Sequence, residues 1–281
     1  MTIIDGKAVS AAVKEEIKLE TAKLKEKGIT VGLAVILVGN DPASKIYVAN
    51  KKKACEDLGF VSEEYLLPEN TKTSELLELI NVLNNEKSIN GILCQLPLPK
   101  QIDEQTVINA ISPLKDVDAF HPSNVGKIMI GDYDFVPCTP AGIMEMLKYY
   151  NIEISGKNCV VIGRSNIVGK PMSMLLLHQN GTVTTCHSRT KDLSKYTREA
   201  DILVSAVGKA NFVTADMVKD GAVVIDVGMN RENGKLCGDV VFDEVSKKAS
   251  FITPVPGGVG PMTIAMLMKN TLTAAKKQNN I

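Results

Sequence analysis

The sequence predicts an α/β protein with two α/β domains, because strand-like and helix-like segments alternate in both halves of the chain. Short runs that are nearly all apolar, several bounded by glycine, have the pattern of strands buried on both faces of a parallel sheet. Segments with helical periodicity lie between them. The alternation resumes near residue 158, after a proline-rich stretch. This second block is typical of a doubly wound, Rossmann-type nucleotide-binding sheet.

In the first half, an amphipathic helix is expected over residues 6–28, where apolar residues repeat at helical spacing and Gly28 ends the pattern. The segments expected after it are a strand over 31–38, a helix over 42–58, a strand over 60–67, a helix over 74–84 and a strand over 91–96. Prolines then interrupt the pattern up to residue 137, with one short helix expected near 104–110. Long irregular segments of this kind are usually functional loops or linkers.

The second half follows the same alternation. The segments expected there are a helix over 141–150, a strand over 158–162, a helix over 168–179, a strand over 182–186, a helix over 193–200, strands over 202–207 and 222–227, a strand-like run over 249–255 and a final helix over 262–276. The polar residues 276–280 are expected to fray.

Composition and charge exclude several classes of protein. The 281 residues include 32 Lys and Arg against 32 Asp and Glu, so bulk attraction to nucleic acid or to a membrane is not expected. No apolar run reaches the length of a spanning helix, and the first ten residues lack the layout of a secretory signal. We therefore expect a cytoplasmic protein. Six cysteines without a CxxC pair and three scattered histidines favour reduced thiols and no metal site.

A glycine- and proline-rich segment over 253–263 precedes the last helix. Glycine lets a flat ligand approach the main chain closely, and Pro261 near a helix start gives up an amide that would be unpaired there. The segment is either a ligand-binding loop or a rigid turn that caps the helix.

The sequence around Gly163 indicates a dinucleotide site. A β-branched strand ends at this glycine, and a helix is expected to begin shortly after it, where first-turn amides favour phosphate. The GxGxxG spacing is incomplete, so a simple strand-to-helix corner remains the alternative. After the next strand an NAD site usually carries an acid for the ribose, and here the sequence is His187-Ser188-Arg189. Arginines at 164 and 189 favour the 2′-phosphate of NADP.

Candidate reacting groups lie in the first half. Ser44, Tyr47 and Lys51 share one stripe of the helix expected over 42–58, and a lysine beside a tyrosine can exchange protons with a bound substrate. Gln95 follows an apolar strand, where α/β sheets bind ligands, and it could orient the lysine. Asp118 offers a carboxylate to paired N–H donors. The alternatives are a solvated lysine run, a strand-end amide and a turn cap.

Seven segments of the sequence carry a resemblance to a known family. They are Tyr-x-x-x-Lys at 47–51, Gln-Leu-Pro-Leu-Pro at 95–99, Lys-Asp-Val-Asp-Ala-Phe at 115–120, Pro-Cys-Thr-Pro at 137–140, Gly-Arg-Ser-x-Ile-Val-Gly-x-Pro at 163–171, Cys-His-Ser at 186–188 and Pro-Val-Pro-Gly-Gly-Val-Gly-Pro-Met-Thr at 254–263. In this order they resemble the bifunctional methylenetetrahydrofolate dehydrogenase/methenyltetrahydrofolate cyclohydrolase family. Ala119 departs from the glycine that is usual there, and alanine resists a positive φ.

The resemblance implies a two-domain enzyme of one-carbon folate metabolism, serving purine biosynthesis, with its site in the cleft between the domains. Residues 1–138 with 256–281 would form the folate-binding catalytic domain, and 139–255 the NADP-binding domain, through which a homodimer would form. NADP-dependent oxidation of 5,10-methylenetetrahydrofolate would be followed by hydrolysis to 10-formyltetrahydrofolate.

The resemblance also assigns site residues. The implied catalytic residues are Tyr47, Lys51, Gln95 and Asp118, with Lys51 as the general acid/base of the hydrolysis. The implied substrate-binding residues are Ser44, Tyr47, Gln95, Leu96, Pro97, Asp118, Pro256, Gly257, Gly258 and Pro261. The implied cofactor-binding residues are Thr139, Gly163, Arg164, Ser165, Ile167, Val168, His187, Ser188, Arg189, Ala206, Val207, Gly208, Asp226, Gly228, Met229, Asn230, Asp239 and Thr263.

Two other functions fit parts of the sequence. A relative with dehydrogenase activity alone would share the folate pocket but lack the proton-transfer lysine, and Lys51 with Tyr47 and Gln95 argues against it. A non-catalytic protein that senses dinucleotide would keep the turn over 163–169 and would have no reason for a second polar site. Folate binding separates the sensor from the enzymes.

Overall fold

The computed structural model describes residues 1–232 and 234–281, apart from the side chain of Ala43. The chain forms two compact units. Unit 1 contains residues 1–11 and 137–263, and unit 2 contains residues 12–136 and 264–281. The domain division predicted from the sequence, at residues 138–139 and 255–256, stays a prediction.

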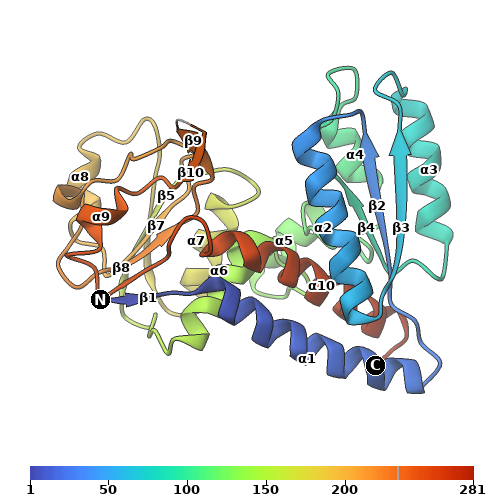
Figure 1. Cartoon of the computed structure of the whole chain (residues 1–281), viewed down its shortest axis with the longest axis horizontal. Coiled ribbons are helices and arrows are strands. Elements are labelled where there is room, and N and C mark those ends of the chain that lie inside the picture. Colours follow the sequence, from blue (N-terminus) through green and yellow to red (C-terminus); the bar gives the residue numbers. More distant parts are fainter. Residues whose placement is uncertain (233) are drawn as a thin grey trace. The chain divides into compact units, whose positions relative to one another are not determined.

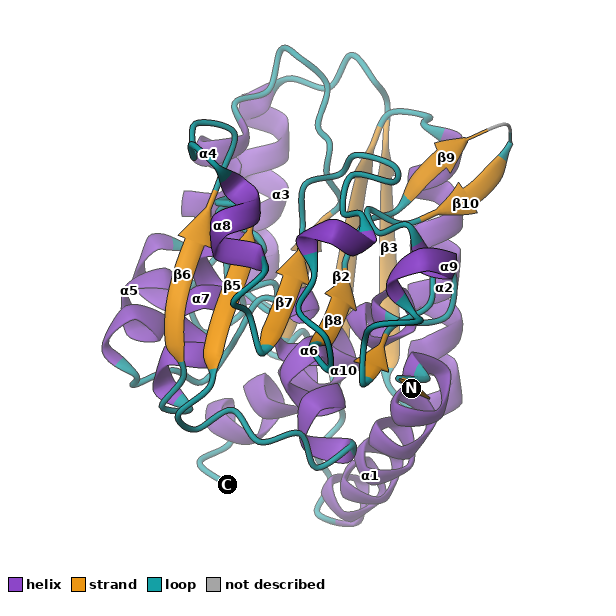
Figure 2. Cartoon of the chain, turned by 90° about the vertical axis from the view of Figure 1, so that its left-hand side faces the viewer, coloured by secondary structure: helices purple, strands orange, loops and turns teal. Residues whose placement is uncertain are grey.

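Unit 1 is built on a parallel sheet. In the part of the chain that the structure describes, this sheet has six strands in the order β1-β11-β8-β7-β5-β6, and Figure 2 shows β6, β5, β7 and β8 side by side. The bounds are Thr2–Ile3 for β1, Asn158–Ile162 for β5, Thr182–Cys186 for β6, Ile202–Ser205 for β7, Val223–Asp226 for β8 and Phe251–Ile252 for β11. The strand order reverses around β5, because β6 lies on one side of it and β7 on the other. Ligands of such sheets bind at the carboxyl ends of the strands beside this reversal.

Helices and a small hairpin complete unit 1 (Figure 1). They are α6 (Cys138–Tyr149), α7 (Gly169–His178), α8 (Leu193–Thr197), the 3-10 turn η1 (Ala215–Met217), the antiparallel pair β9 (Asn230–Glu232) and β10 (Lys235–Cys237), and α9 (Phe242–Val245). The β-branched residues of β5, β7 and β8 are buried, so the sheet has the all-apolar character that the sequence predicts for strands in a parallel sheet.

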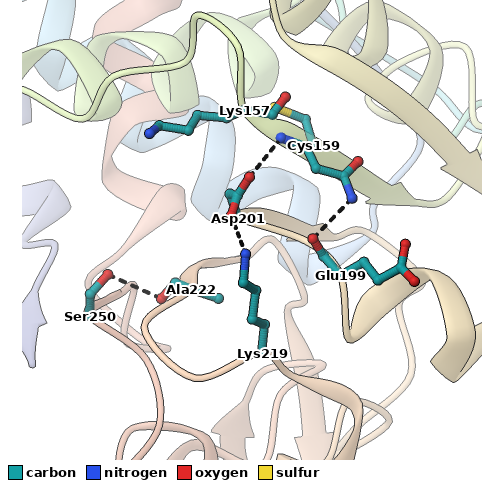
Figure 3. Close-up of polar contacts among 8 residues, drawn as sticks. Lys157, Cys159, Glu199, Asp201, Lys219, Ala222 and Ser250 are labelled. Carbon is teal, nitrogen blue, oxygen red and sulfur yellow. Dashed lines mark hydrogen bonds and ion pairs between the residues drawn. The ribbon is translucent and has the colours of Figure 1, made fainter.

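An ion-paired carboxylate joins the amino ends of the strands in unit 1 (Figure 3). Asp201, directly before β7, accepts a hydrogen bond from the backbone N–H of Asn158 at 2.9 Å and from Lys219 Nζ at 2.5 Å. The side chain of Asn158 donates to the Glu199 carbonyl at 2.9 Å. The Lys219 hydrogen bond is the largest cause that holds the pKa of Asp201 below its ordinary value. This network joins strands at the end of the sheet opposite to the one where ligands bind.

Unit 2 contains a smaller parallel sheet, which in the described residues has the order β3-β2-β4. The central strand β2 (Gly32–Val38) is buried at every position. The neighbouring strands are β3 (Val61–Leu67) and β4 (Gly91–Cys94), and the helices are α2 (Pro42–Leu58), α3 (Thr73–Asn85), α4 (Glu104–Ala110) and α5 (Pro122–Ile130). Helices α1 (Gly6–Glu26) and α10 (Val259–Gln278) each begin in unit 1 and end in unit 2. The structure describes no helix long and apolar enough to cross a membrane.

The structure corrects several predicted elements. The proline-rich region contains an additional helix, α5, because Pro122 occupies a first-turn position and the His121 side chain accepts the Ser123 N–H at its start. The predicted strands over 91–96 and 202–207 end earlier, at Cys94 and Ser205. The predicted fraying of 276–280 is wrong up to Gln278, which remains in α10 and donates a side-chain hydrogen bond to the Asn90 carbonyl at 2.9 Å.

Gly126 gives a test of helix propensity in α5. It is exposed in the helix interior, and a methyl group built on it meets nothing within 4 Å. Glycine at such a position is less favourable than alanine by about 0.5–1 kcal/mol. We expect Gly126→Ala to raise the free energy of unfolding by about this amount, as measured by urea denaturation. A lower free energy of unfolding would contradict the assignment of Gly126 to a regular helix.

Candidate active site

The turn after β5 has the geometry of a phosphate-binding turn. The Ser165 hydroxyl accepts the backbone N–H groups of Val168 and Gly169 at 3.2 and 3.3 Å, which caps the start of α7. Arg164 and Ser165 are exposed beside these first-turn amides. A helix N-terminus attracts anions because its amides are unpaired and its dipole is positive there.

Two glycines of this turn are required by space. Gly163 has φ +135°, and a methyl group on it would lie 2.5 Å from the Ala206 carbonyl oxygen. A methyl group on Gly169 would lie 2.2 Å from the Gly163 carbonyl oxygen and 2.7 Å from the Arg164 nitrogen. The turn after β5 therefore packs against itself and against the segment after β7, without room for a side chain.

The segment after β6 forms a second polar turn at the same edge of the sheet. Arg189 N–H donates to His187 Nδ1 at 3.1 Å, and His187 N–H donates to the Thr190 hydroxyl at 2.8 Å. Ser188 and Arg189 are exposed. The turn thus presents a cation and a hydroxyl, without an acidic side chain in residues 187–190, which fits a phosphorylated ribose.

Two buried carboxylates lie at the carboxyl end of β7 and β8. Asp226, the last residue of β8, accepts the backbone N–H groups of Gly228 and Asp239 at 2.9 Å each and that of Val240 at 3.0 Å. Asp239 accepts the N–H of Val207 at 2.8 Å. Burial raises the pKa of Asp226 to about 6, and repulsion from Asp239 adds to this rise against the backbone hydrogen bonds.

The raised pKa of Asp226 predicts a pH-dependent contribution to stability. The folded protein binds more protons than the unfolded chain between the ordinary pKa of 3.8 and the folded pKa of about 6. Stability from this group is therefore greatest below the unfolded pKa and falls as the pH rises through the folded pKa. We expect the free energy of unfolding of the wild type, relative to Asp226→Asn, to fall by about 2 kcal/mol between pH 4 and pH 7. Urea unfolding at both pH values measures this, and a constant difference would contradict it.

Lys51 and Gln95 form the central contact of the candidate site in unit 2. Lys51 Nζ donates to Gln95 Oε1 at 2.7 Å, and Gln95 Nε2 donates to the Leu96 carbonyl at 2.7 Å. The backbone N–H of Gln95 donates to the Ile36 carbonyl of β2 at 2.8 Å, which fixes the residue beyond the end of β4. The amide is thus oriented at both ends and directs its oxygen to the lysine.

The start of α2 explains how its candidate residues are presented. The Asp41 side chain accepts the Ser44 N–H at 2.7 Å, and Pro42 occupies the first turn. Helix α2 ends at Gly59, which has a left-handed conformation. Ser44 is buried and Tyr47 is 39% exposed. Tyr47 and Lys51 are four residues apart on the helix and therefore lie on one face.

The loop that carries Asp118 is held by its two preceding residues. Lys115 Nζ donates to the carbonyls of Leu83 and Glu86 at the end of α3, at 2.9 and 2.6 Å, and burial lowers its pKa. Asp116 accepts the N–H of His121 at 2.8 Å, and burial raises its pKa.

This loop also contains Ala119. Its φ of +58° is left-handed, so the departure from glycine noted in the sequence falls where alanine is unfavourable. Ala119 N–H donates to the Asp116 carbonyl at 3.1 Å. The hydrogen bonds of Asp116 thus hold this conformation in the presence of a side chain, and Asp118 lines one hollow with Leu96 and Phe120.

The glycine- and proline-rich segment is closed by the start of α1 within unit 1. Gly6 N–H donates to the Gly257 carbonyl at 3.0 Å, and the Ser10 hydroxyl donates to the Pro261 carbonyl at 3.1 Å. Gly257 has φ +104°, and a methyl group on Gly6 would lie 1.7 Å from the Gly258 carbonyl oxygen. The segment is therefore a fixed loop that depends on residues near the amino terminus.

The predicted site residues fall into sets that the structure places in single units. Every predicted cofactor residue lies in unit 1, at the carboxyl edge of the sheet or in the first turns of α6 and α10, and the predicted loop residues Pro256, Gly257, Gly258 and Pro261 lie in unit 1 as well. The other predicted substrate and catalytic residues lie in unit 2. Contact is shown directly for Lys51 with Gln95 and for Asp239 with Val207, Gly208 and Asn230. Their roles stay predictions.

Sequence reasoning missed the residues that build the loops. Gly6, Ser10, Lys115 and Asp116 were not predicted to take part, although each binds a segment that carries candidate residues. A glycine directly before an amphipathic helix was a usable signal at Gly6. The other contacts join residues far apart in sequence, and spacing alone does not indicate them.

Comparisons with known proteins agree with this geometry. Residues 4–118 match the family model described as tetrahydrofolate dehydrogenase/cyclohydrolase, catalytic domain, and residues 137–279 match the NAD(P)-binding domain of the same family. A bifunctional protein FolD from Acetivibrio thermocellus is 63% identical over 277 residues, which covers 98% of this chain and 97% of the relative.

Two solved structures extend the likeness to the fold. A bifunctional FolD methylenetetrahydrofolate dehydrogenase/cyclohydrolase from Campylobacter jejuni is 55% identical with a TM-score of 0.97, covering 99% of each chain. The Trypanosoma brucei methylenetetrahydrofolate dehydrogenase-cyclohydrolase, solved with NADP and an inhibitor, is 41% identical with a TM-score of 0.95, covering 100% of this chain and 99% of that one. With both family models matched in order, this chain belongs to the tetrahydrofolate dehydrogenase/cyclohydrolase family.

Proposed function

We propose that the protein oxidises 5,10-methylenetetrahydrofolate with NADP+ to the 5,10-methenyl compound and hydrolyses that compound to 10-formyltetrahydrofolate. The observation that carries the proposal is the 2.7 Å hydrogen bond from Lys51 to Gln95, at the end of β4. A dehydrogenase alone has no need for a lysine oriented in this way. The family match supplies the folate substrate class.

The residues after β5 and β6 fit NADP. The cradle formed by Gly163 and Gly169, which a single methyl group would fill, leaves the main chain open to a pyrophosphate. We propose that Arg164, Ser165 and Arg189 hold the 2′-phosphate, and that small residues at 206–208 and 228 face the nicotinamide. The remaining predicted cofactor residues would line the same edge of the sheet. When bound, NADP+ accepts a hydride from the one-carbon bridge of the substrate.

Lys51 is proposed to move protons in the hydrolysis. Water forms a bond to the methenyl carbon and gives a proton to the Lys51 amine, and the carbon–nitrogen bond to N5 then breaks. The electron pair stays on N5, which takes a proton from Lys51, while the new hydroxyl loses its proton to give the formyl group. Gln95 accepts a hydrogen bond from the amine and so fixes its direction, and Tyr47 lies on the same helix face.

Substrate recognition is proposed for two further segments. The Asp118 carboxylate would accept paired hydrogen bonds from the pterin ring N–H and 2-amino group. Its loop is held by Asp116 and Lys115, which supports a fixed position for the acid. In unit 1, the loop over 256–261 would lie against the flat part of the substrate, because its glycines expose main chain.

The wider setting is proposed from the family resemblance. We propose a catalytic domain of residues 1–138 and 256–281, an NADP domain of residues 139–255, and a homodimer formed through the NADP domain. Equal numbers of acidic and basic residues and the absence of a long apolar helix in the described residues are compatible with a cytoplasmic enzyme.

The test is a two-product assay. The purified protein is mixed with 5,10-methylenetetrahydrofolate and either NADP+ or NAD+, and the reduced cofactor and the 10-formyl product are followed separately. We expect both products with NADP+ and slower turnover with NAD+. Reduced cofactor with accumulating methenyl compound would indicate a dehydrogenase alone, and binding of NADP+ without turnover would indicate a sensor.

A further inference from the structure

Asp239 collects the polar groups of the loop after β7 around one carboxylate. The side chain is fully buried and lies between β10 and α9. Its donors are Val207 N–H at 2.8 Å, Lys209 N–H at 2.9 Å, Asn230 Nδ2 at 3.0 Å, Gly208 N–H at 3.2 Å and Ser205 Oγ at 3.2 Å. Three successive amides thus turn inward to one acid, and this fixes the loop's path.

A second carboxylate fixes Asp239 itself. Asp226 accepts the backbone N–H groups of Asp239 and Val240, and it holds Gly228 N–H through the same oxygen that accepts from Asp239. The end of β8 is therefore tied to the backbone of Asp239, and the Asp239 side chain is tied to the loop after β7. The two acids form a continuous link between the segments after β7 and β8.

The link leaves no spare room. A methyl group on Gly228 would lie 2.2 Å from Asp239 Oδ1, and one on Gly238 would lie 1.8 Å from Asp226 Oδ2. These glycines let the main chain approach the carboxylates closely. A longer or displaced acid has no alternative place, so the position of the loop depends on this carboxylate at this distance.

The loop held in this way forms one wall of the proposed dinucleotide site. Ala206, next to the three bound amides, accounts for the closest approach to Gly163 in the turn after β5. Ala206 N–H also donates to the Ile162 carbonyl at the end of β5, at 2.8 Å. A shift of residues 207–209 would therefore be transmitted to the turn that we propose to hold the pyrophosphate.

We propose that Asp239 is a positioning residue for NADP+ binding, which acts through the backbone of residues 207–209 and not by contact with the cofactor. Its full burial and its five donors support this role. The inference rests on the proposed function, and it assigns the geometry of the nicotinamide-side loop to an acid more than 30 residues away in sequence.

Asp201 provides the contrast to a purely structural role. It lies at the other end of β7, and it also accepts a backbone N–H, from Asn158 (Figure 3). Loss of its charge should lower stability without moving the loop after β7. Asp243, four residues after Asp239, is exposed and controls for the removal of an acid in the same segment.

The experiment measures NADP+ binding directly, by titration calorimetry with Asp239→Asn, Asp201→Asn and Asp243→Asn. An asparagine keeps one acceptor oxygen and turns an NH₂ group toward the remaining donors, so part of the loop is released. We expect Asp239→Asn to weaken NADP+ binding by about 10- to 100-fold, as small displacements of binding groups do. The two control variants should bind NADP+ as the wild type does.

Hydrogen exchange supplies the readout that general destabilisation would not give. In Asp239→Asn, the amides of residues 207–209 should exchange faster while those of β5 keep their protection. If Asp239→Asn does not fold, Ser205→Ala removes one donor to the acid, and we expect it to weaken NADP+ binding about 3-fold.

The outcomes separate this inference from the proposed function. A wild-type protein that does not bind NADP+ would overturn the proposed function. A wild type that binds, with unchanged binding in Asp239→Asn and Ser205→Ala, would overturn the positioning role alone. Equal losses of affinity in Asp239→Asn and Asp201→Asn would do the same, because the effect would then follow stability.

Discussion

Replacing Lys51 by methionine should reduce the cyclohydrolase rate by about 10²- to 10⁴-fold, the usual contribution of a positioned general acid/base. NADP+ binding should remain near that of the wild type, because Lys51 lies in unit 2 and every proposed cofactor residue lies in unit 1. The measurement is the rate of 10-formyl product formed from 5,10-methenyltetrahydrofolate, compared with the rate of cofactor reduction from the methylene substrate. Methenyl compound should accumulate when the methylene substrate is supplied.

The physical reason lies in what methionine keeps and what it removes. Methionine has a similar length and an unbranched chain, so the packing of α2 changes little. It removes the amine that donates to Gln95 Oε1 at 2.7 Å, and with it the group that would carry protons to and from the substrate. Gln95 keeps its hydrogen bond to the Leu96 carbonyl, so its side chain stays in place.

The same lysine run supplies the control. Lys53→Met removes an exposed lysine two residues away, and we expect both activities to remain unchanged. If Lys51→Met hydrolyses the methenyl compound at the wild-type rate, the assignment of the general acid/base is wrong. If both variants lose both activities, the cause is the fold of α2 and not proton transfer.

The sequence predicted the elements whose signals are local. The apolar run over 31–38 gave β2, which is buried throughout, because a strand between two parallel neighbours must be apolar on both faces. Helix α2 was predicted with its correct bounds, since Pro42 marks its first turn and a glycine follows its last residue. Both signals lie within the element or beside it.

The predictions were less accurate where tertiary contacts decide. Prolines and a glycine made the region of α5 look irregular, although Pro122 in the first turn is compatible with a helix. The last residues of α10 looked free to fray, but Gln278 and Lys276 bind residues of the first half of the chain. Periodicity carries no information on such partners.

The candidate site shows the same division. The pair Lys51 and Gln95 could be predicted because a helix stripe and a strand end are recognisable motifs, and the structure shows their hydrogen bond. The link from Asp226 through Asp239 to the loop after β7 consists of side-chain acceptors and distant backbone donors. An acid that serves amides 30 residues away has the same local pattern as an acid in solvent, so sequence spacing cannot distinguish the two.

Gly169→Ala should reduce NADP+ affinity by roughly 100-fold or more, since the atoms that would have to move belong to the main chain of the phosphate-binding turn. A methyl group there would lie 2.2 Å from the Gly163 carbonyl oxygen. Such overpacking against backbone costs about 1–3 kcal/mol when it is relieved by a shift. The shift would displace the first-turn amides of α7 from the pyrophosphate. Calorimetric titration with NADP+ measures the loss, and urea unfolding shows whether the fold remains.

The two variants should lose opposite halves of the reaction. Hydrolysis of 5,10-methenyltetrahydrofolate needs no hydride acceptor, so Gly169→Ala should keep this activity when the methenyl compound is supplied, while Lys51→Met should lose it. Dehydrogenation needs the cofactor, so Gly169→Ala should lose it at NADP+ concentrations that saturate the wild type. Gly126→Ala, where the added methyl group meets nothing within 4 Å, controls for the substitution itself. If Gly169→Ala binds NADP+ as tightly as the wild type, the pyrophosphate does not lie at the start of α7, and the turn after β5 is only a corner of the sheet.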